Sequence, residues 1–420
     1  MSRSWRLIAR RSAPFLLEPD WTRPLLEWDD PSLVEVARGT HRHVVRFLAA
    51  NHKIYALKEL PGTDAMREYR LLGAMAEDGL PVVERVGVVQ RDELDDVLIT
   101  RFLDFSLPYR HLFSQSWGTL TGTSEVTERL LDALGLLLVR MHLLGYYWGD
   151  CSLNNTLLKR DGGALAAYVV DVETGEHHPS LTDGQRRSDL EITELNVAGG
   201  LMDVQAELGI ADGMDPLAIA TELRRRYDRL WEELRREEVV PMGERFRIDQ
   251  RIRRLNDLGF HVNEVEIEPI PGTENGLMRL RASVSEQGHH SRRLLELTGL
   301  RAQENQARLL LNDLASFRSW VESVEGRPMP QTVAAYRWLA EVFEPTVAAI
   351  PEHLTDRFEP VEVFLDMLRH KWLLSERAGA DVGLGEAVRD YLDSVLPAAP
   401  AERVVIADED DLDEGWIGYG

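Results

Sequence analysis

The 420-residue chain contains a single cysteine, Cys151, and no long uninterrupted apolar run. One thiol excludes an internal disulfide and any zinc site built from several cysteines, and it fits a reducing compartment. The longest apolar stretch, 130–144, is interrupted and falls short of the roughly 20 residues that a membrane span needs. We therefore expect a cytoplasmic protein with no membrane span.

Positive charge is also scarce, since 48 Lys and Arg residues stand against 71 Asp and Glu residues, a net charge of −23. This balance repels phosphate backbones and anionic headgroups, which disfavours general nucleic-acid binding. Residues 1–30 are locally basic, because four arginines precede the first acid, Glu18. They lack the apolar core and cleavage site of a targeting signal, so we expect an N-terminal arm docked on the body.

Lysine accounts for only four of the basic residues, and one of them lies inside an apolar strand. Arginine supplies most of the general positive charge, so a lysine in such a place is less often incidental. Lys58 occupies Ile54–Leu60, which alternates and is rich in strand-forming residues. A water-facing lysine at a strand edge is the plainer alternative.

The first lobe is expected over residues 31–103, with strands and one amphipathic helix. That helix should begin at Asp64 and end before Gly79, since the two residues suit a cap and a stop. The expected elements are strands 33–37, 44–49, 54–60, 82–89 and 96–102, and helix 64–77.

A second, helical lobe is expected over residues 104–240, followed by a C-terminal domain over 241–396 and an acidic tail over 397–420. The fold class is therefore α+β, with a mixed α/β, mainly helical C-terminal domain. The last twenty residues hold seven acids and one arginine. The expected elements are helices 125–144, 189–209, 216–238 and 245–258, the hairpin strands 156–158 and 166–170, and strands 261–270 and 277–284.

Three polar residues flank the expected hairpin. Asp150 and Asn155 stand five apart before it, and Asp171 ends its second, apolar strand. A buried unpaired carboxylate is costly, so an acid in this place is usually a ligand or a cap. Phosphoryl transfer needs an Asp at the attacking hydroxyl, an Asn and an Asp on Mg²⁺, and a Lys on the phosphates. The pattern indicates such a site.

Together with Lys58, these residues resemble the protein-kinase-like superfamily over residues 31–235, in its lipopolysaccharide-kinase and aminoglycoside-phosphotransferase branch. The resemblance implies a two-lobed fold with ATP and Mg²⁺ as cofactors. Lys58 matches the phosphate-binding lysine, and Glu68 matches its ion-pair partner. The resemblance further implies that Asp150 is the catalytic aspartate and that Asp189 braces the catalytic loop. It implies Asn155 and Asp171 as metal ligands, with Asn154 in place of Asn155 if the register slips by one residue. It also implies that Gly39 lies in the phosphate loop and that the adenine lies at Thr100, Arg101 and Leu103.

Departures from the family pattern narrow the expected substrates and the expected regulation. Trp148-Gly149 replaces His-Arg, which removes the partner of a phosphorylated activation loop. The segment between Asp171 and Asp189 is too short for the platform that holds a peptide substrate. Glu173, in place of a glycine, is expected to be a solvated loop acid in preference to a metal ligand. Cys151 is expected to be a bystander.

The second half of the chain carries fewer signals. The whole chain resembles a bacterial family in which a lipopolysaccharide-kinase-like domain precedes a C-terminal domain of unknown function. His289-His290 is expected at a polar helix start, since helical metal sites use i,i+3 or i,i+4 spacing. A protein partner could bind this domain or the acidic stretch 408–414, which is expected to be mainly solvated.

The leading hypothesis is an ATP- and Mg²⁺-dependent phosphotransferase that acts on a hydroxyl of a small molecule or on itself. The alternative is a pseudokinase-type, nucleotide-binding scaffold whose C-terminal domain binds a protein partner. The ordered presence of Lys, Glu, Asp, Asn and Asp favours the enzyme.

Overall fold

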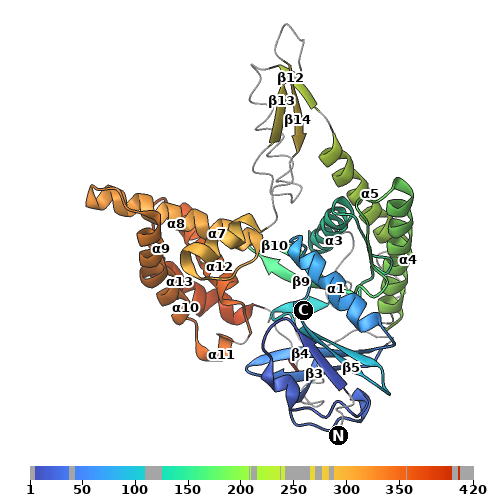
Figure 1. Cartoon of the computed structure of the whole chain (residues 1–420). Helices are drawn as coiled ribbons and strands as arrows, with labels where there is room; N and C mark the ends of the chain where they lie inside the picture. Colours follow the sequence, from blue (N-terminus) through green and yellow to red (C-terminus); the bar gives the residue numbers. More distant parts are fainter. Residues whose placement is uncertain are drawn as a thin grey trace.

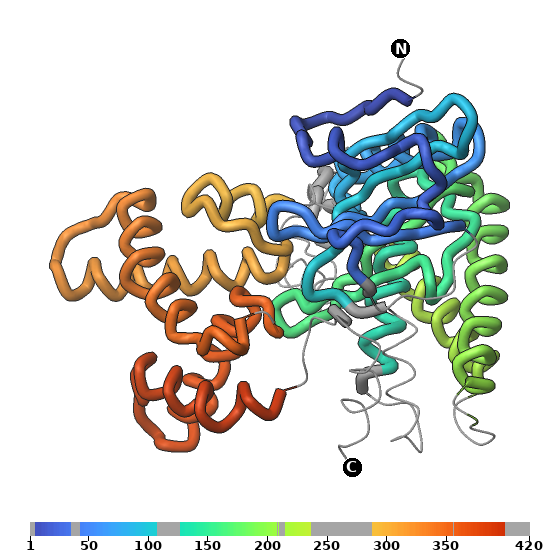
Figure 2. Tube along the Cα trace, turned by 90° about the horizontal axis from the view of Figure 1, so that it is seen from below, coloured from blue at the N-terminus to red at the C-terminus, as the bar shows by residue number. Residues whose placement is uncertain are grey.

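The computed structural model shows a two-lobed N-terminal region joined to a mainly helical C-terminal region (Figure 1). Figure 2 shows helices α7 to α13 as a body beside the two lobes. The structure describes residues 5–36, 43–108, 125–207, 209, 215–236, 238–241, 265–269, 277–282, 288–355, 357–399 and 405–406.

An antiparallel sheet forms the first lobe, with the strand order β1-β5-β6-β4-β3-β2-β15. The five strands expected from the sequence are present, and two more extend the sheet at its edges. The strands are β1 (Trp5–Ala9), β2 (Leu33–Val36), β3 (Val45–Ala50), β4 (Lys53–Leu60), β5 (Arg85–Arg91), β6 (Asp96–Arg101) and β15 (Val405–Ile406).

The two faces of this sheet are covered by different parts of the chain. Helix α1 (Asp64–Glu77), with the bounds expected, packs its buried side chains against one face. The segment after β1 covers the other face with Leu16, Trp21 and Leu25, all fully buried. These residues of the arm are thus part of the core of the lobe, in line with the docked arm expected from the sequence.

The second lobe is built around α3 (Glu125–Leu143), which packs against α5 and the hairpin strand β10. Its buried leucines are Leu130, Leu131, Leu134, Leu137 and Leu138. Strand β7 joins the hairpin as its third strand, and β8 pairs with β11. The remaining elements are α4 (Asp183–Glu207), α5 (Pro216–Arg235), β7 (Ser106–Pro108), β8 (Tyr146–Tyr147), β9 (Thr156–Asp161), β10 (Ala164–Val169) and β11 (Glu176–His177).

The C-terminal region consists of a three-stranded sheet and a helical body. The sheet extends away from the lobes at the top of Figure 1. Aromatic packing around Trp338, Phe343 and Phe364 forms the core of the helical body. Its elements are β12 (Glu238–Pro241), β13 (Val265–Pro269), β14 (Leu277–Ala282), α7 (His289–Thr298), α8 (Glu304–Glu325), α9 (Gln331–Trp338), a π-helical turn (Leu339–Phe343), α10 (Glu344–Ala348), α11 (Glu352–Thr355), α12 (Pro360–Ala378), α13 (Leu384–Asp390), a second π-helical turn (Tyr391–Val395) and a 3₁₀ turn (Leu396–Ala398).

Two expectations need comment. The expected helix 245–258 lies outside the described residues. The tail 397–420 is not wholly separate from the body, because Val405 and Ile406 pair with β2. No described helix has the length and apolar character to cross a membrane.

The buried arm predicts a large effect of a single substitution. Trp21→Ala should lower the free energy of unfolding by about 3–5 kcal/mol, because removal of this large side chain leaves a cavity against the sheet. Its indole Nε1 also donates to the Leu16 carbonyl at 2.8 Å. Leu17→Ala is the control, since Leu17 is exposed and should change the free energy by less than about 0.5 kcal/mol. Equal midpoints of urea unfolding for both variants would contradict the packing described.

Candidate active site

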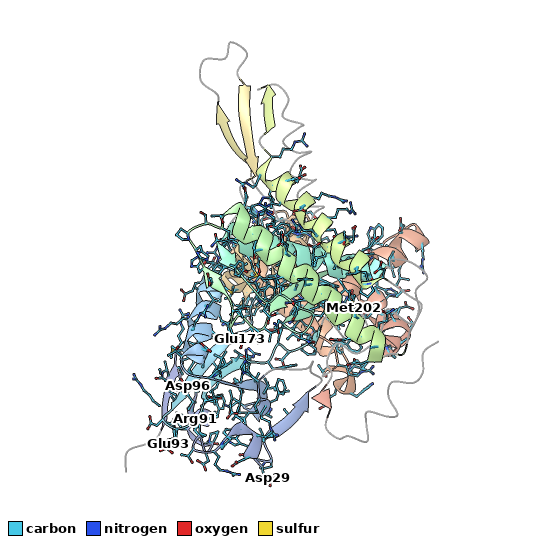
Figure 3. The ribbon with its side chains drawn as sticks, turned by 90° about the vertical axis from the view of Figure 1, so that its right-hand side faces the viewer. Asp29, Arg91, Glu93, Asp96, Glu173 and Met202 are labelled. Atoms are coloured by element: carbon cyan, nitrogen blue, oxygen red, sulfur yellow. The ribbon has the colours of Figure 1, made fainter. Side chains whose placement is uncertain are left out.

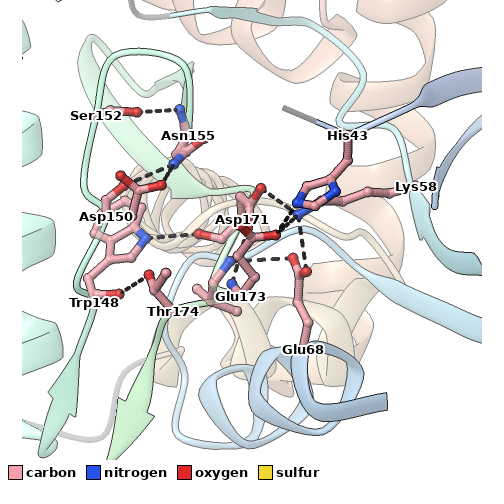
Figure 4. A network of polar contacts seen from close by, with 11 residues as sticks. His43, Lys58, Glu68, Trp148, Asp150, Ser152, Asn155, Asp171, Glu173 and Thr174 are labelled. Atoms are coloured by element: carbon pink, nitrogen blue, oxygen red, sulfur yellow. Dashed lines mark hydrogen bonds and ion pairs between the residues drawn. The ribbon is translucent and has the colours of Figure 1, made fainter. Parts of the chain in front are cut away.

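Lys58 is the centre of a cluster of charges between the two lobes (Figure 4). Its Nζ lies 2.5 Å from Asp171, 3.2 Å from Glu68 and 3.2 Å from Glu173. Burial disfavours the ammonium, but the charges of the three carboxylates outweigh it and raise the pKa of Lys58. Lys58 therefore remains a cation in the site.

Glu173 does not lie in solvent, so the expectation of a solvated loop acid was wrong. Figure 3 places it at the boundary between the lobes. Besides Lys58, it contacts His43, whose Nε2 lies 3.0 Å from its carboxylate. One carboxylate oxygen from each of Glu68, Asp171 and Glu173 lies within 4.8 Å of the others, a spacing that could hold a metal ion.

Helix α1 holds the segment that carries Asp171. Glu68 is fully buried and accepts a hydrogen bond from the backbone N–H of Val172. Arg67, one residue earlier, donates to the carbonyl of Gly175 at 2.9 Å. Burial raises the pKa of Glu68, and the charge of Asp171 adds to this rise while Lys58 opposes it. The helix therefore links the lysine of one lobe to the aspartate of the other.

Two asparagines orient Asp150 in the loop between β8 and β9, which the family resemblance implies to be the catalytic loop. Asn155 Nδ2 donates to the Asp150 carboxylate at 3.1 Å and to its carbonyl at 2.9 Å. Asn196, on α4, donates to the other carboxylate oxygen at 2.9 Å. Both oxygens of Asp150 are thus oriented by neutral donors. The role of Asn196 has no signal in the sequence, because it lies 46 residues away on another element.

Asp189 braces this loop, as the resemblance implied. Its buried carboxylate accepts the backbone N–H groups of Trp148 at 2.8 Å and Gly149 at 2.7 Å. His142 lies 3.0 Å from the same carboxylate and 2.7 Å from the hydroxyl of Tyr227. These buried contacts fix the entry to the catalytic loop.

Trp148 connects the catalytic loop to the strand end that carries Asp171. Its indole Nε1 donates to the Asp171 carbonyl at 2.8 Å, and its own carbonyl accepts from the Thr174 hydroxyl at 2.9 Å. Gly149 follows with φ of 75°, a conformation that favours glycine. The Trp-Gly pair that replaces His-Arg thus has a structural role in the site.

A cavity of about 360 Å³ opens over these groups. It is lined by residues from both lobes, including Lys58, Asp150, Asn155, Asp171 and Glu173. Asn154 also lines it, and its buried Oδ1 has no hydrogen-bond partner within the described parts of the chain. A buried acceptor in that position suits a cation or a donor group of a ligand.

Comparison with known families assigns the two halves of the chain separately. Residues 36–197 match the model of the "Lipopolysaccharide kinase (Kdo/WaaP) family". This segment of the N-terminal half is therefore similar to that kinase family. Residues 229–396 match the "Domain of unknown function (DUF4032)" and form the second assigned region. Similarity to a family of kinases points to phosphotransfer by this part of the chain.

Other comparisons add little to this assignment. A solved structure described as "WaaP in complex with acyl carrier protein" is 17% identical, with a TM-score of 0.36, over 60% of this chain and 99% of that one. The search of curated proteins found no match.

The residues expected at the adenine lie on β6 and just after it, outside the lining of the cavity described above. Thr100 is buried on β6, paired with Ala56 of β4. The Arg101 N–H donates to the Glu84 carbonyl, and the Arg101 side chain pairs with Glu84 and Asp104. Thr100, Arg101 and Leu103 are not among the lining residues of the 360 Å³ cavity. Gly39 lies outside the described residues. Their roles in the kinase-family domain remain predictions.

Cys151 adjoins Asp150 but is fully buried, and burial raises the pKa of its thiol well above the usual value. Because the thiolate is the reactive form, the native protein should not react with a thiol reagent such as Ellman's reagent. In concentrated guanidinium one thiol per chain should react. Rapid reaction of the native protein would contradict the burial of the catalytic loop.

Proposed function

We propose that the kinase-family domain is an ATP- and Mg²⁺-dependent phosphotransferase that acts on a hydroxyl of a small molecule or of the chain itself. One observation carries the proposal: Lys58, Asp150 and Asp171, from three separate segments, line a single cavity. Phosphoryl transfer depends mainly on positioning and electrostatic stabilisation, which this set of groups provides.

Lys58, held by Glu68, would bind phosphate oxygens of ATP. The cluster itself is short of positive charge, because three carboxylates surround one lysine. Like charges at this spacing favour the binding of a cation. Asn155 and Asp171 would hold Mg²⁺, with Glu173 close enough to contribute. The bound ion would neutralise charge on the phosphates.

Asp150 would orient the acceptor hydroxyl and accept its proton. As the acceptor oxygen bonds to the γ-phosphorus, the bond from that phosphorus to the bridging oxygen of ADP breaks. The donors Asn155 and Asn196 fix the carboxylate for this step. Precise orientation of such a group contributes much of the rate in proximity-driven reactions.

The short path after Asp171 supports a small acceptor or autophosphorylation. Residues 173–182 pass through the two-residue strand β11 and enter α4 directly. This length leaves no segment on which a peptide substrate would lie.

Asp150→Asn tests the reaction with labelled ATP as the probe, by following transfer of the γ-phosphate to water and to the chain. The variant should lose at least about a hundredfold in rate, since it cannot accept the proton. Its affinity for ATP should stay within about threefold of the wild type, because no phosphate-binding group changes. Asp92→Asn, at an exposed turn position, is the matched control and should retain full rate.

Two outcomes would contradict the proposal. Equal rates for Asp150→Asn and the wild type would remove Asp150 from the chemistry. A wild type that binds ATP but transfers phosphate to neither water nor itself nor any hydroxyl compound would support the nucleotide-binding scaffold instead.

A further inference from the structure

Hairpin β9–β10 directly joins the two candidate metal ligands. Asn155 precedes β9, and Asp171 follows β10. At the base of the hairpin, the Val170 N–H donates to the Asn155 carbonyl at 3.1 Å, next to the pair formed by Thr156 and Val169. The pairing of this hairpin therefore sets the separation of Asn155 and Asp171.

The turn of the same hairpin is held by the C-terminal region (Figure 1). The Gly162 N–H donates to Glu362 Oε1 at 2.5 Å, and Gln306 Nε2 donates to the same oxygen at 2.9 Å. Both side chains are fully buried. Removing this acceptor would take away the partner of the Gly162 N–H, whereas Gln306 Nε2 would keep its longer contacts with Glu359 Oε2 at 3.2 Å and the Arg160 carbonyl at 3.4 Å. A partly buried donor left without its partner costs more than an ordinary hydrogen bond is worth.

Asp161, beside that glycine, caps a helix of the C-terminal region. Its carboxylate accepts the N–H groups of Gln306 at 2.8 Å and Asn305 at 3.3 Å, at the start of α8. Asn305 Nδ2 in turn donates to the Asp161 carbonyl at 2.7 Å. The first N–H groups of a helix lack partners within the helix, and a carboxylate satisfies them well. Each side thus stabilises a terminus of the other.

Ion pairs surround these hydrogen bonds. Lys159 lies 2.8 Å from Glu359, and Arg160 lies 2.8 Å from Asp366. The fit is close, because a Cβ added at Gly162 would lie 2.7 Å from Leu309 Cδ1. The turn is therefore fixed by polar contacts and by shape together.

We propose that the DUF4032 region positions the phosphotransfer site, with Gln306 and Glu362 as positioning residues that act through hairpin β9–β10 on Asn155 and Asp171. The inference rests on the proposed function of that site. It assigns the C-terminal region a role in the reaction, although it contributes no lining residue to the cavity of about 360 Å³ among the residues described.

The test compares Glu362→Ala with Glu362→Gln, which keeps Oε1 as an acceptor. The control is Glu376→Ala, at an exposed position of the same helix, α12. The first readout is amide hydrogen exchange over 150–158 and 168–174, without nucleotide. The second is turnover of labelled ATP at varied Mg²⁺. Both are measured on the full chain, well below the melting temperature.

In Glu362→Ala we expect exchange at 168–174 to accelerate at least tenfold. We expect kcat to fall about ten- to a hundredfold and the apparent Mg²⁺ affinity to weaken by a similar factor, as found when groups behind metal ligands are removed. The KM for ATP at saturating Mg²⁺ should stay within about threefold, because Lys58 is untouched. Glu362→Gln should recover most of each loss.

Unchanged exchange in a folded Glu362→Ala would overturn the inference, as would unchanged kcat and Mg²⁺ dependence in a wild type that transfers phosphate. If the wild type does not transfer phosphate, the proposed function fails and hydrogen exchange alone decides the inference. If Glu362→Ala does not fold, Arg160→Met replaces it. Arg160 is partly exposed and pairs with Asp366 and Glu362, so a smaller change in the same direction is expected.

Discussion

The backbone hydrogen bond from Val170 to Asn155 closes the base of hairpin β9–β10, and the site depends on this closure. The catalytic loop enters at one end of the hairpin, and Asp171 leaves at the other. Strand β10 also contacts the first lobe, since the Val83 N–H donates to the Val169 carbonyl at 3.1 Å. A single two-stranded element therefore fixes the loop, the aspartate and the junction of the lobes.

Charge explains why this frame must be rigid. Three carboxylates converge on Lys58 with little access to solvent. Each would be unfavourable there without the lysine that pairs with all three. Buried hydrogen bonds from Val172 to Glu68, from Trp148 to the Asp171 carbonyl and from Gly149 to Asp189 hold these groups in place. The excess of carboxylates over cations leaves a deficit of positive charge that Mg²⁺ would reduce.

Local signals in the sequence were sufficient for much of the fold. Helix α1 has the expected bounds, because its periodicity ends where Gly79 follows with a φ of 81°. The expected cap was wrong, since Asp64 is the first residue of the helix and Thr63 is its N-cap, with no side-chain hydrogen bond. The edge strands β1 and β15 were not expected, since short edge strands carry weak alternation and gain stability from their neighbour. The lysine in an apolar strand and the acid at a strand end identified Lys58 and Asp171 as candidates.

Contacts between distant segments could not be predicted from local sequence signals. Glu173 was expected in solvent, because its burial against Lys58 and His43 arises only when the lobes meet. Asn196 and Asp161 act on residues of other elements, at sequence separations that no local pattern encodes. The general lesson is that residue types at a site are visible in the sequence, whereas the groups that orient them are not.

The central claim is that Lys58 and Asp171 form one site for Mg²⁺ and ATP, and thermal melting tests it most directly. Mg²⁺ with ATP should raise the melting temperature of the wild type, because a ligand at a hundredfold excess over its Kd stabilises the folded state by about 2.7 kcal/mol. The shift should shrink strongly in Lys58→Ala and in Asp171→Asn. A wild type that shows no shift, or variants that shift as far as the wild type, would contradict the account.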